Sequence, residues 1–258
     1  MLGTVFLASL FAGTLAPAPY AKQFRDEPDA PPTRQHWLGT DDLGRDRYSR
    51  VLHGTRISLL LAPAAAFLAA LLAGALGGLA GYLGGWTERC LMATADLVLS
   101  LPWLFLLLAV RALMPLNVAP MESVMITFLI LGCLGWAAGA RVVCAGASAM
   151  RDSDFALQAQ ALGCSQVRLL WRHMAPNLRP LLLAQFWISV PVFILAEANL
   201  GILGLGVSEP LPSWGSLLRE MEGLTAVSGK PWVLVPLLLL MVSVTAFQVL
   251  LTEQETLA

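Results

Sequence analysis

The residues that could carry acid–base or metal chemistry are few and scattered. The three histidines, His36, His53 and His173, lie in polar stretches or at the ends of apolar ones. An enzyme needs a nucleophile with a base, or a set of metal ligands, that meet at one place. Neither H-E-x-x-H nor G-x-S-x-G occurs in the sequence. The pattern therefore disfavours catalysis and predicts no catalytic residue.

Residues 223–230 superficially resemble a phosphate-binding loop, because two glycines precede a lysine. Five residues separate Gly223 from Gly229, however, and Pro231 stands where the motif requires Ser or Thr. The sequence therefore predicts that this chain does not bind ATP through such a loop.

Three aspartates, Asp41, Asp42 and Asp46, gather in a short polar stretch and in isolation suggest a cation site. Gly39 and Gly44 suit tight turns between them. The nearby counter-charges are Arg45, Arg47 and Arg50. We interpret the stretch as a rigid structural element and predict no metal site.

The composition indicates a membrane protein. Of the 258 residues, 57% are hydrophobic and only 13% are charged, whereas soluble domains have about 25% charged residues. The net charge of −1 gives no reason to expect a nucleic-acid partner. The four cysteines show no paired spacing and are interpreted as small buried residues, namely Cys90, Cys133, Cys144 and Cys164.

Six stretches are long and apolar enough to cross a bilayer, which takes about 20 residues. Four are free of charge and two contain only isolated charges; they are residues 2–21, 57–87, 90–114, 123–140, 180–208 and 231–252. We therefore predict an all-α integral membrane protein with six transmembrane helices. Within 57–87, four glycines favour close packing against a neighbouring helix over a second crossing. These are Gly74, Gly77, Gly78 and Gly81.

The first stretch has an alternative interpretation as a secretory signal peptide. That interpretation requires a basic region before the apolar run, and the first basic residue is Lys22. We therefore keep residues 1–21 as a transmembrane helix. The segment 22–56 follows as a polar region, residues 57–252 form a five-helix core, and 253–258 form a short tail.

The polar stretch 151–180 has the pattern of two short helices. Asp152, Ser153 or Asp154 can cap the first, and Ser165 can cap the second. The apolar positions of the first helix, Phe155, Ala159 and Leu162, recur at helical spacing. The apolar positions of the second helix are Val167, Leu170, Trp171 and Met174. Gly163 can end the first helix and Pro176 is expected to stop the second. From the pattern alone, a protein-docking knob and a helix pair lying on lipid headgroups are equally plausible.

This stretch resembles the coupling loop, often called the EAA loop, of ATP-binding-cassette importer permeases. At matching places stand Leu157-Gln158-Ala159, Ala161-Leu162-Gly163 and Trp171 to Asn177. The triplet lacks the family's acidic residue, at Leu157. The resemblance assigns ATPase coupling to Leu157, Gln158, Ala159, Leu162, Gly163, Arg168, Arg172 and Pro176.

Other stretches are similar to the oligopeptide, dipeptide and nickel permeases, over about residues 36–219. They are His36 to Asp46 (HWLGTDDLGRD), Gly54 to Ser58, Asp96 with Leu101-Pro102, Glu197 to Leu200, Leu203 to Gly206 and Pro212 to Gly215. The resemblance implies that Gly39, Thr40, Asp41, Gly44, Arg45, Asp46 and Trp214 belong to extracytoplasmic motifs. We expect Trp214 to anchor a loop at the membrane interface. The tail Thr252 to Ala258 departs from the family pattern.

The two ionisable residues inside predicted spans, Asp96 and Glu197, are candidates for the translocation path or gate. Such side chains usually face protein or a water-filled cavity. For Glu197 a path role and a hydrogen-bonded structural role both stay open, whereas for Asp96, near a helix end, the structural role is favoured.

The resemblance implies the type I importer permease fold, in a multi-pass protein of the cell (inner) membrane. Lys and Arg counts alone would place 22–56 inside, but the resemblance places it outside, with the coupling loop and both termini in the cytoplasm. The implied partners are a second permease, two ATPase subunits that hold ATP and Mg²⁺, an extracytoplasmic binding protein and the lipid bilayer. No cofactor is expected on this chain.

Peptide cargo is favoured, and nickel, opines or small sugars stay open. The rival function classes are an intramembrane enzyme and a purely structural or regulatory subunit.

Overall fold

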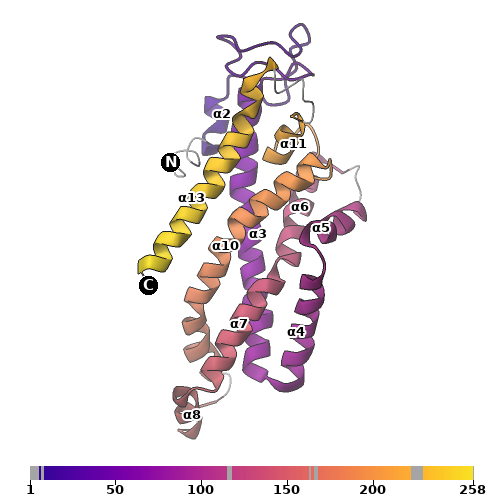
Figure 1. Cartoon of the computed structure of the whole chain (residues 1–258). Helices are drawn as coiled ribbons and strands as arrows, with labels where there is room; N and C mark the ends of the chain where they lie inside the picture. Colours follow the sequence, from indigo (N-terminus) through magenta and orange to yellow (C-terminus); the bar gives the residue numbers. More distant parts are fainter. Residues whose placement is uncertain are drawn as a thin grey trace. The chain divides into compact units, whose positions relative to one another are not determined.

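The computed structural model describes residues 6, 9–114, 118–162, 164–165, 168–221 and 229–257, and its regular elements are helices (Figure 1). In chain order these are α2 (Ala12–Leu15), α3 (Arg47–Leu83), α4 (Gly85–Ser100), α5 (Trp103–Ala112), α6 (Pro120–Leu134), α7 (Trp136–Arg151), α8 (Asp154–Ala161), η1 (Leu169–Met174), α10 (Ala175–Ile202), α11 (Trp214–Arg219), η2 (Pro231–Leu234) and α13 (Val235–Leu257). The all-α prediction is confirmed.

Four stretches of helix in the described part of the chain are long and apolar enough to cross a membrane. They are Arg47–Leu83, Pro120–Arg151, Ala175–Ile202 and Pro231–Thr252. A fifth candidate is the pair α4 and α5, which bends by 90° between Ser100 and Trp103. The stretch 90–114, predicted as one continuous span, is therefore broken at Leu101-Pro102. Pro102 has no backbone N–H to continue the ladder of α4.

Helix α3 begins ten residues before the predicted span, at Arg47 instead of residue 57. Asp46 caps it, since its Oδ2 accepts a hydrogen bond from the Ser49 N–H at 2.8 Å. The polar first turns of α3 lie among the charged residues of segment 22–56, which explains why hydropathy alone placed the start too late.

The predicted first span, 2–21, falls partly on residues outside the described part of the chain. Its described helical residues are 6, 9–10 and 12–15. The helix ends at Leu15, and Ala16 is extended, with ψ of 125°, so the expectation of a helix through residue 21 is wrong for 16–21. The crossing itself, and the count of six, stay predictions.

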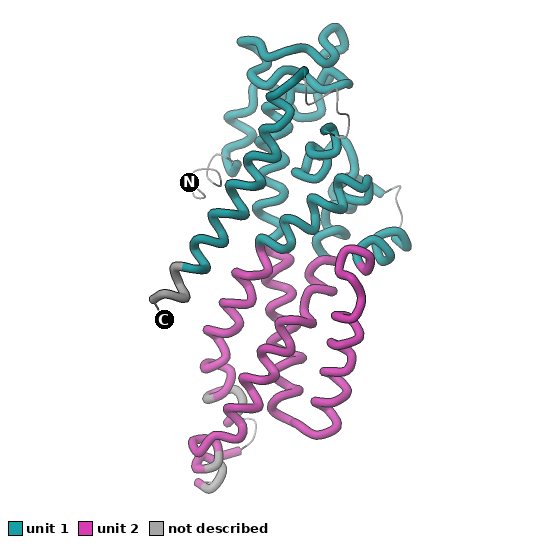
Figure 2. The backbone as a smooth tube through the Cα atoms, in the orientation of Figure 1, with its two compact units in different colours: residues 1–62, 107–129, 191–258 teal, residues 63–106, 130–190 magenta. Residues whose placement is uncertain are grey.

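The chain forms two compact units, coloured separately in Figure 2. Unit 1 comprises residues 1–62, 107–129 and 191–258, and unit 2 comprises 63–106 and 130–190. Helices α3, α5, α6 and α10 contribute to both, and the divisions within α3 and α10 fall at Pro63 and Pro191. A proline inside a helix removes one backbone hydrogen bond, so these two divisions coincide with a local weakness in the helix ladder.

Close packing is present inside unit 2 at three of the four glycines that the sequence indicated, and absent at Gly78 among the described residues. A Cβ on Gly77 would lie 2.3 Å from the Ala140 carbonyl oxygen, and one on Gly81 would lie 2.4 Å from that of Cys144. These two glycines therefore let α3 approach the backbone of α7. A Cβ on Gly74 would meet the Leu182 side chain of α10 at 3.0 Å. Small residues thus set the helix spacing, as is common in membrane bundles.

Candidate functional site

Segment 22–56 of unit 1 contains two turns at the glycines that the sequence analysis identified. Gly39 and Gly44 have φ of 70° and 73°, in the left-handed region that favours glycine. A Cβ on Gly44 would also lie 2.2 Å from the Phe24 carbonyl oxygen. The hydroxyl of Thr40 accepts from the Ala30 N–H at 2.8 Å. The segment is therefore an ordered structure that needs glycine at both turns.

Two of the three aspartates considered as a cation site, Asp41 and Asp46, bind protein groups, whereas Asp42 is exposed. Asp41 is fully buried, and its carboxylate accepts from the Arg45 N–H at 2.7 Å and from Arg45 Nε at 2.6 Å. Asp46 is also buried and receives Ser49 Oγ at 2.7 Å, with His36 Nδ1 at 2.8 Å. These contacts support the structural interpretation of the motif over a cation site.

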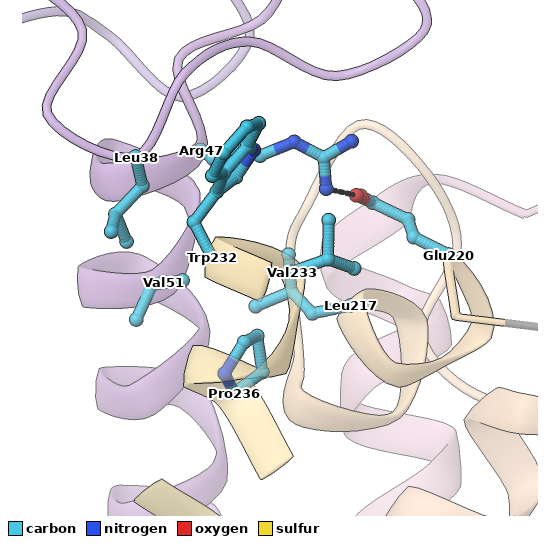
Figure 3. Close-up of a pocket in the computed structure, with 8 residues that line it drawn as sticks. All are labelled: Leu38, Arg47, Val51, Leu217, Glu220, Trp232, Val233 and Pro236. Atoms are coloured by element: carbon cyan, nitrogen blue, oxygen red, sulfur yellow. Dashed lines mark hydrogen bonds and ion pairs between the residues drawn. The ribbon is translucent and has the colours of Figure 1, made fainter. Parts of the chain in front are cut away.

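The arginines of this segment form ion pairs with glutamates far away in the sequence. No pattern in the sequence indicated these pairs. Arg50 is fully buried and lies 3.5 Å from Asp41 and 2.9 Å from Glu209. Arg45 contacts Glu209 as well, at 2.5 Å. Arg47 pairs with Glu220 beside Trp232 and Val233 (Figure 3). We call Asp41, Arg45, Arg47, Arg50, Glu209 and Glu220 the charge network.

The two glutamates of the charge network respond differently to their surroundings. Burial alone would raise the pKa of Glu209, but the hydrogen bond and charge of Arg50, with Arg45, hold that pKa below its usual value. For Glu220, burial raises the pKa even though the charges of Arg47 and Arg50 act to lower it. Glu209 is therefore the better stabilised anion.

Trp214 is buried inside unit 1, so its side chain contacts protein and not the lipid headgroups. Its Nε1 donates to Thr55 Oγ1 at 3.0 Å, and its backbone N–H donates to Ser58 Oγ at 3.3 Å. Ser213 begins α11 with a capping box shared with Ser216. Trp214 therefore anchors a loop, namely the loop before α11, and it anchors that loop to helix α3.

Glu197 of α10 is fully buried and belongs to the same cluster. Its Oε2 accepts from Ser58 Oγ at 3.1 Å, with Ser213 and the Gly215 backbone nearby, and its Oε1 has no hydrogen-bond partner in the described part of the chain. Gly201 lies one turn further along α10, where a Cβ would be 2.4 Å from Gly215 Cα. The surroundings of Glu197 favour the structural role over a role in the path.

Replacing Glu197 tests this choice. Glu197→Gln keeps an oxygen that accepts from Ser58, so we expect normal assembly and transport. Glu197→Leu removes the acceptor and leaves buried donors unpaired, which costs about 1–3 kcal/mol. We expect a lower apparent melting temperature of the detergent-solubilised importer for the leucine variant only. A glutamine variant that assembles and melts normally but fails to transport would place Glu197 in the path instead.

Arg111 fixes the end of the bent helix pair, a role that sequence inspection missed. It is 1% exposed; its Nε donates to the Leu205 carbonyl at 2.9 Å and its Nη2 to Ser123 Oγ at 3.1 Å. Ser123 Oγ in turn donates to the Gly206 carbonyl at 3.3 Å. A lone arginine in an apolar run was the available signal, since such a side chain needs internal partners.

The loop 151–175, in unit 2, contains the two predicted caps. Ser153 Oγ accepts from the Ala156 N–H and Ser165 Oγ from the Arg168 N–H, both at 3.4 Å. Ala156 is buried in a core with the ends of α3, α7 and α10. That core comprises Tyr82, Val143, Ala147, Ala156, Leu169, Met174 and Leu178. The loop is therefore packed onto its own helix ends.

One expectation for this loop is wrong. Pro176 does not stop the helical run, because it lies in the first turn of α10, where a missing N–H is tolerated. Among the apolar residues of α8 and the turn after it, Phe155 and Leu162 are 50% and 88% exposed, whereas Ala156 is buried. Gly163 and the side chain of Leu157 lie outside the described residues.

The exposed side of the loop carries apolar and basic side chains next to the acidic Asp152 and Asp154. We call five of its exposed residues, Phe155, Gln158, Leu162, Arg168 and Arg172, the loop face. Ala159 packs against the core beneath. Exposed apolar side chains next to arginines are typical of protein-binding surfaces.

Asp96 of α4 pairs with Arg141 of α7, also in unit 2. Both side chains are about half exposed, at 51% and 54%. The expected hydrogen-bonded contact with a neighbouring helix is present, but the carboxylate is not enclosed by the protein.

The long apolar helices, the internal ion pairs and the packed polar loop define a multi-pass membrane protein. The family described as "Binding-protein-dependent transport system inner membrane component" matches residues 57–253, and this chain belongs to that family. It is a permease subunit of an ATP-binding-cassette importer of the peptide type, located in the inner membrane, and it is a non-enzymatic transport component.

Three relatives illustrate the similarity. The oligopeptide transport system permease protein OppC of Bacillus subtilis is 32% identical, over 88% of this chain and 72% of its own length. The dipeptide transport system permease protein DppC of the same organism is 32% identical, over 95% and 75%. The glutathione transport system permease protein GsiD of Escherichia coli is 33% identical, over 95% and 79%.

Proposed function

We propose that this chain forms half of the translocation path of an ATP-driven peptide importer and docks a separate ATPase through the loop face. The observation that carries the docking proposal is the exposure of Phe155 and Leu162 on a loop whose other side is firmly packed. Exposed apolar side chains that lie beside arginines on a packed loop are typical of a protein-binding surface. The named relatives transport peptides, which supports peptide cargo over nickel.

The proposed complex contains a second permease, two ATPase subunits with their ATP and Mg²⁺, and an extracytoplasmic binding protein. In it, the loop 151–175 and both termini face the cytoplasm, and segment 22–56 faces outward. Segment 22–56 has many arginines, yet Arg45, Arg47 and Arg50 are paired with carboxylates. These pairs supply a reason why a count of basic residues gives the opposite orientation.

The docking proposal predicts that charge on the loop face separates the ATPase from the permease. The double variant Phe155→Asp, Leu162→Asp should still insert and fold, because both side chains are exposed. We expect tagged importer purified in mild detergent to lose nearly all of its ATPase subunit and ATP hydrolysis. Leu43→Asp, at a leucine of segment 22–56 that is 48% exposed, serves as the control.

Loss of the ATPase from the Leu43→Asp complex, with full retention in the double variant, would contradict docking at the loop face. Equal retention in both variants would contradict it as well.

A further inference from the structure

An exposed ion pair joins two helices of unit 2 that belong to membrane-span candidates, the stretch Pro120–Arg151 and the bent pair α4 and α5. Asp96 stands one turn before the end of α4, and Arg141 stands in the second turn of α7. About half of each side chain is accessible on this chain. A charged side chain facing hydrocarbon at the bilayer centre is unfavourable by about 2.5–3.5 kcal/mol. The face that bears this pair is therefore unsuited to lipid.

The pair continues into a polar seam along α4 and α7. Glu88 precedes Asp96 by eight residues, which places both on the same side of α4. Its Oε1 lies 4.0 Å from Cys144 Sγ of α7. Ser148 follows Arg141 by seven residues on α7, and its Oγ donates to the Gly81 carbonyl at 3.4 Å. We call Glu88, Asp96, Arg141 and Ser148 the polar seam.

The chemistry of the pair matches a solute that carries both charges. A carboxylate such as Asp96 accepts hydrogen bonds from an ammonium, and the guanidinium of Arg141 can hold a carboxylate with two parallel bonds. When no solute is present, the two side chains neutralise each other. A zwitterion would replace one salt bridge by two, so neither protein charge would be left unpaired.

We propose that the polar seam lines the water-filled path and that Asp96 and Arg141 form a contact site for zwitterionic cargo, such as a peptide with free termini. The proposal rests on the proposed function as a permease. In the competing arrangement, the second permease subunit covers the seam and the ion pair only joins subunits. The two arrangements differ in whether water and small ions reach the pair in the assembled importer.

The rate at which introduced cysteines react with water-soluble reagents in the whole importer distinguishes the two arrangements. The four native cysteines are replaced by serine, and Asp96→Cys and Arg141→Cys are introduced one at a time. Inverted vesicles and proteoliposomes are treated with methanethiosulfonates bearing either a sulfonate or a trimethylammonium group. Leu71→Cys is the control, because Leu71 is a residue of unit 2 that is 53% exposed on an apolar stretch of α3.

We expect both new cysteines to react at least about tenfold faster than Leu71→Cys, with opposite charge preference. Asp96→Cys leaves Arg141 and should favour the sulfonate reagent; Arg141→Cys leaves Asp96 and should favour the trimethylammonium reagent. Should either variant fail to assemble, Met92→Cys leaves the pair intact and lies on the same side of α4, between Glu88 and Asp96. It should also react faster than the control.

The cargo half of the proposal is tested by protection. Ala-Ala with free termini should slow modification of Met92→Cys, whereas N-acetyl-Ala-Ala-amide, which has no charged terminus, should not. Equal effects of the two dipeptides would overturn the zwitterion site. Reaction as slow as at Leu71→Cys for every variant, in an importer that still hydrolyses ATP, would overturn the water-lined seam while leaving the permease function intact.

Discussion

Arg50→Met is expected to lower the free energy of unfolding by about 3–5 kcal/mol, because removing one member of a buried charge group leaves the others uncompensated. Arg50 is fully buried beside the fully buried Asp41, and its Nη2 lies 2.9 Å from Glu209. Methionine fills much of the side-chain volume but supplies no positive charge. The variant should therefore unfold at a lower SDS fraction in mixed micelles.

Arg56→Met is the matched control for Arg50→Met. Arg56 lies on the same helix and is exposed, so its replacement should shift the unfolding midpoint little. Similar midpoints for both variants would show that the charge network contributes nothing specific to the stability of unit 1.

Gly77→Ala is expected to destabilise unit 2 by about 1–3 kcal/mol, the usual range for overpacking. The new methyl group would lie 2.3 Å from the Ala140 carbonyl oxygen and 2.9 Å from Ala140 Cα. Both are backbone atoms, so α3 and α7 must move apart. The expected result is a lower midpoint in the same SDS titration, together with reduced recovery of the assembled importer.

The adjacent Gly78→Ala provides the contrast. Among the described residues, a Cβ there would meet only Leu178 Cδ1, at 4.0 Å, and alanine favours a helix over glycine by up to about 1 kcal/mol. We expect an unchanged or slightly raised midpoint. If Gly78→Ala destabilises the protein as much as Gly77→Ala, the close approach of α3 to α7 is not what requires glycine.

Features that depend on local sequence were predictable. Helical spacing, capping residues and the glycines of α3 act over a few residues, so Ser165 and Gly77 could be assigned from the sequence, and the first cap could be narrowed to three neighbouring residues, 152–154. The break at Leu101-Pro102 was also present as a local signal. It was missed because the average hydropathy of 90–114 is that of one continuous span.

Features that depend on long-range contacts were not predictable. Arg50 meets Glu209 across more than 150 residues of sequence, and no pattern near either residue identifies its partner. The role of Glu197 was open for the same reason, since Ser58 lies on another helix. The exposure of Phe155 and Leu162 could not be predicted either, because periodicity identifies apolar positions and cannot tell a core from a docking surface.

The most direct test of the central claim is ATP-driven uptake in proteoliposomes. Liposomes would hold this chain, its partner permease and the ATPase subunits, with the binding protein and a labelled peptide outside and ATP inside. We predict peptide accumulation that requires both ATP and this chain, and that is lost when Phe155→Asp, Leu162→Asp replaces the wild type. Uptake that persists without this chain, or with the ATPase subunits omitted, would contradict the account.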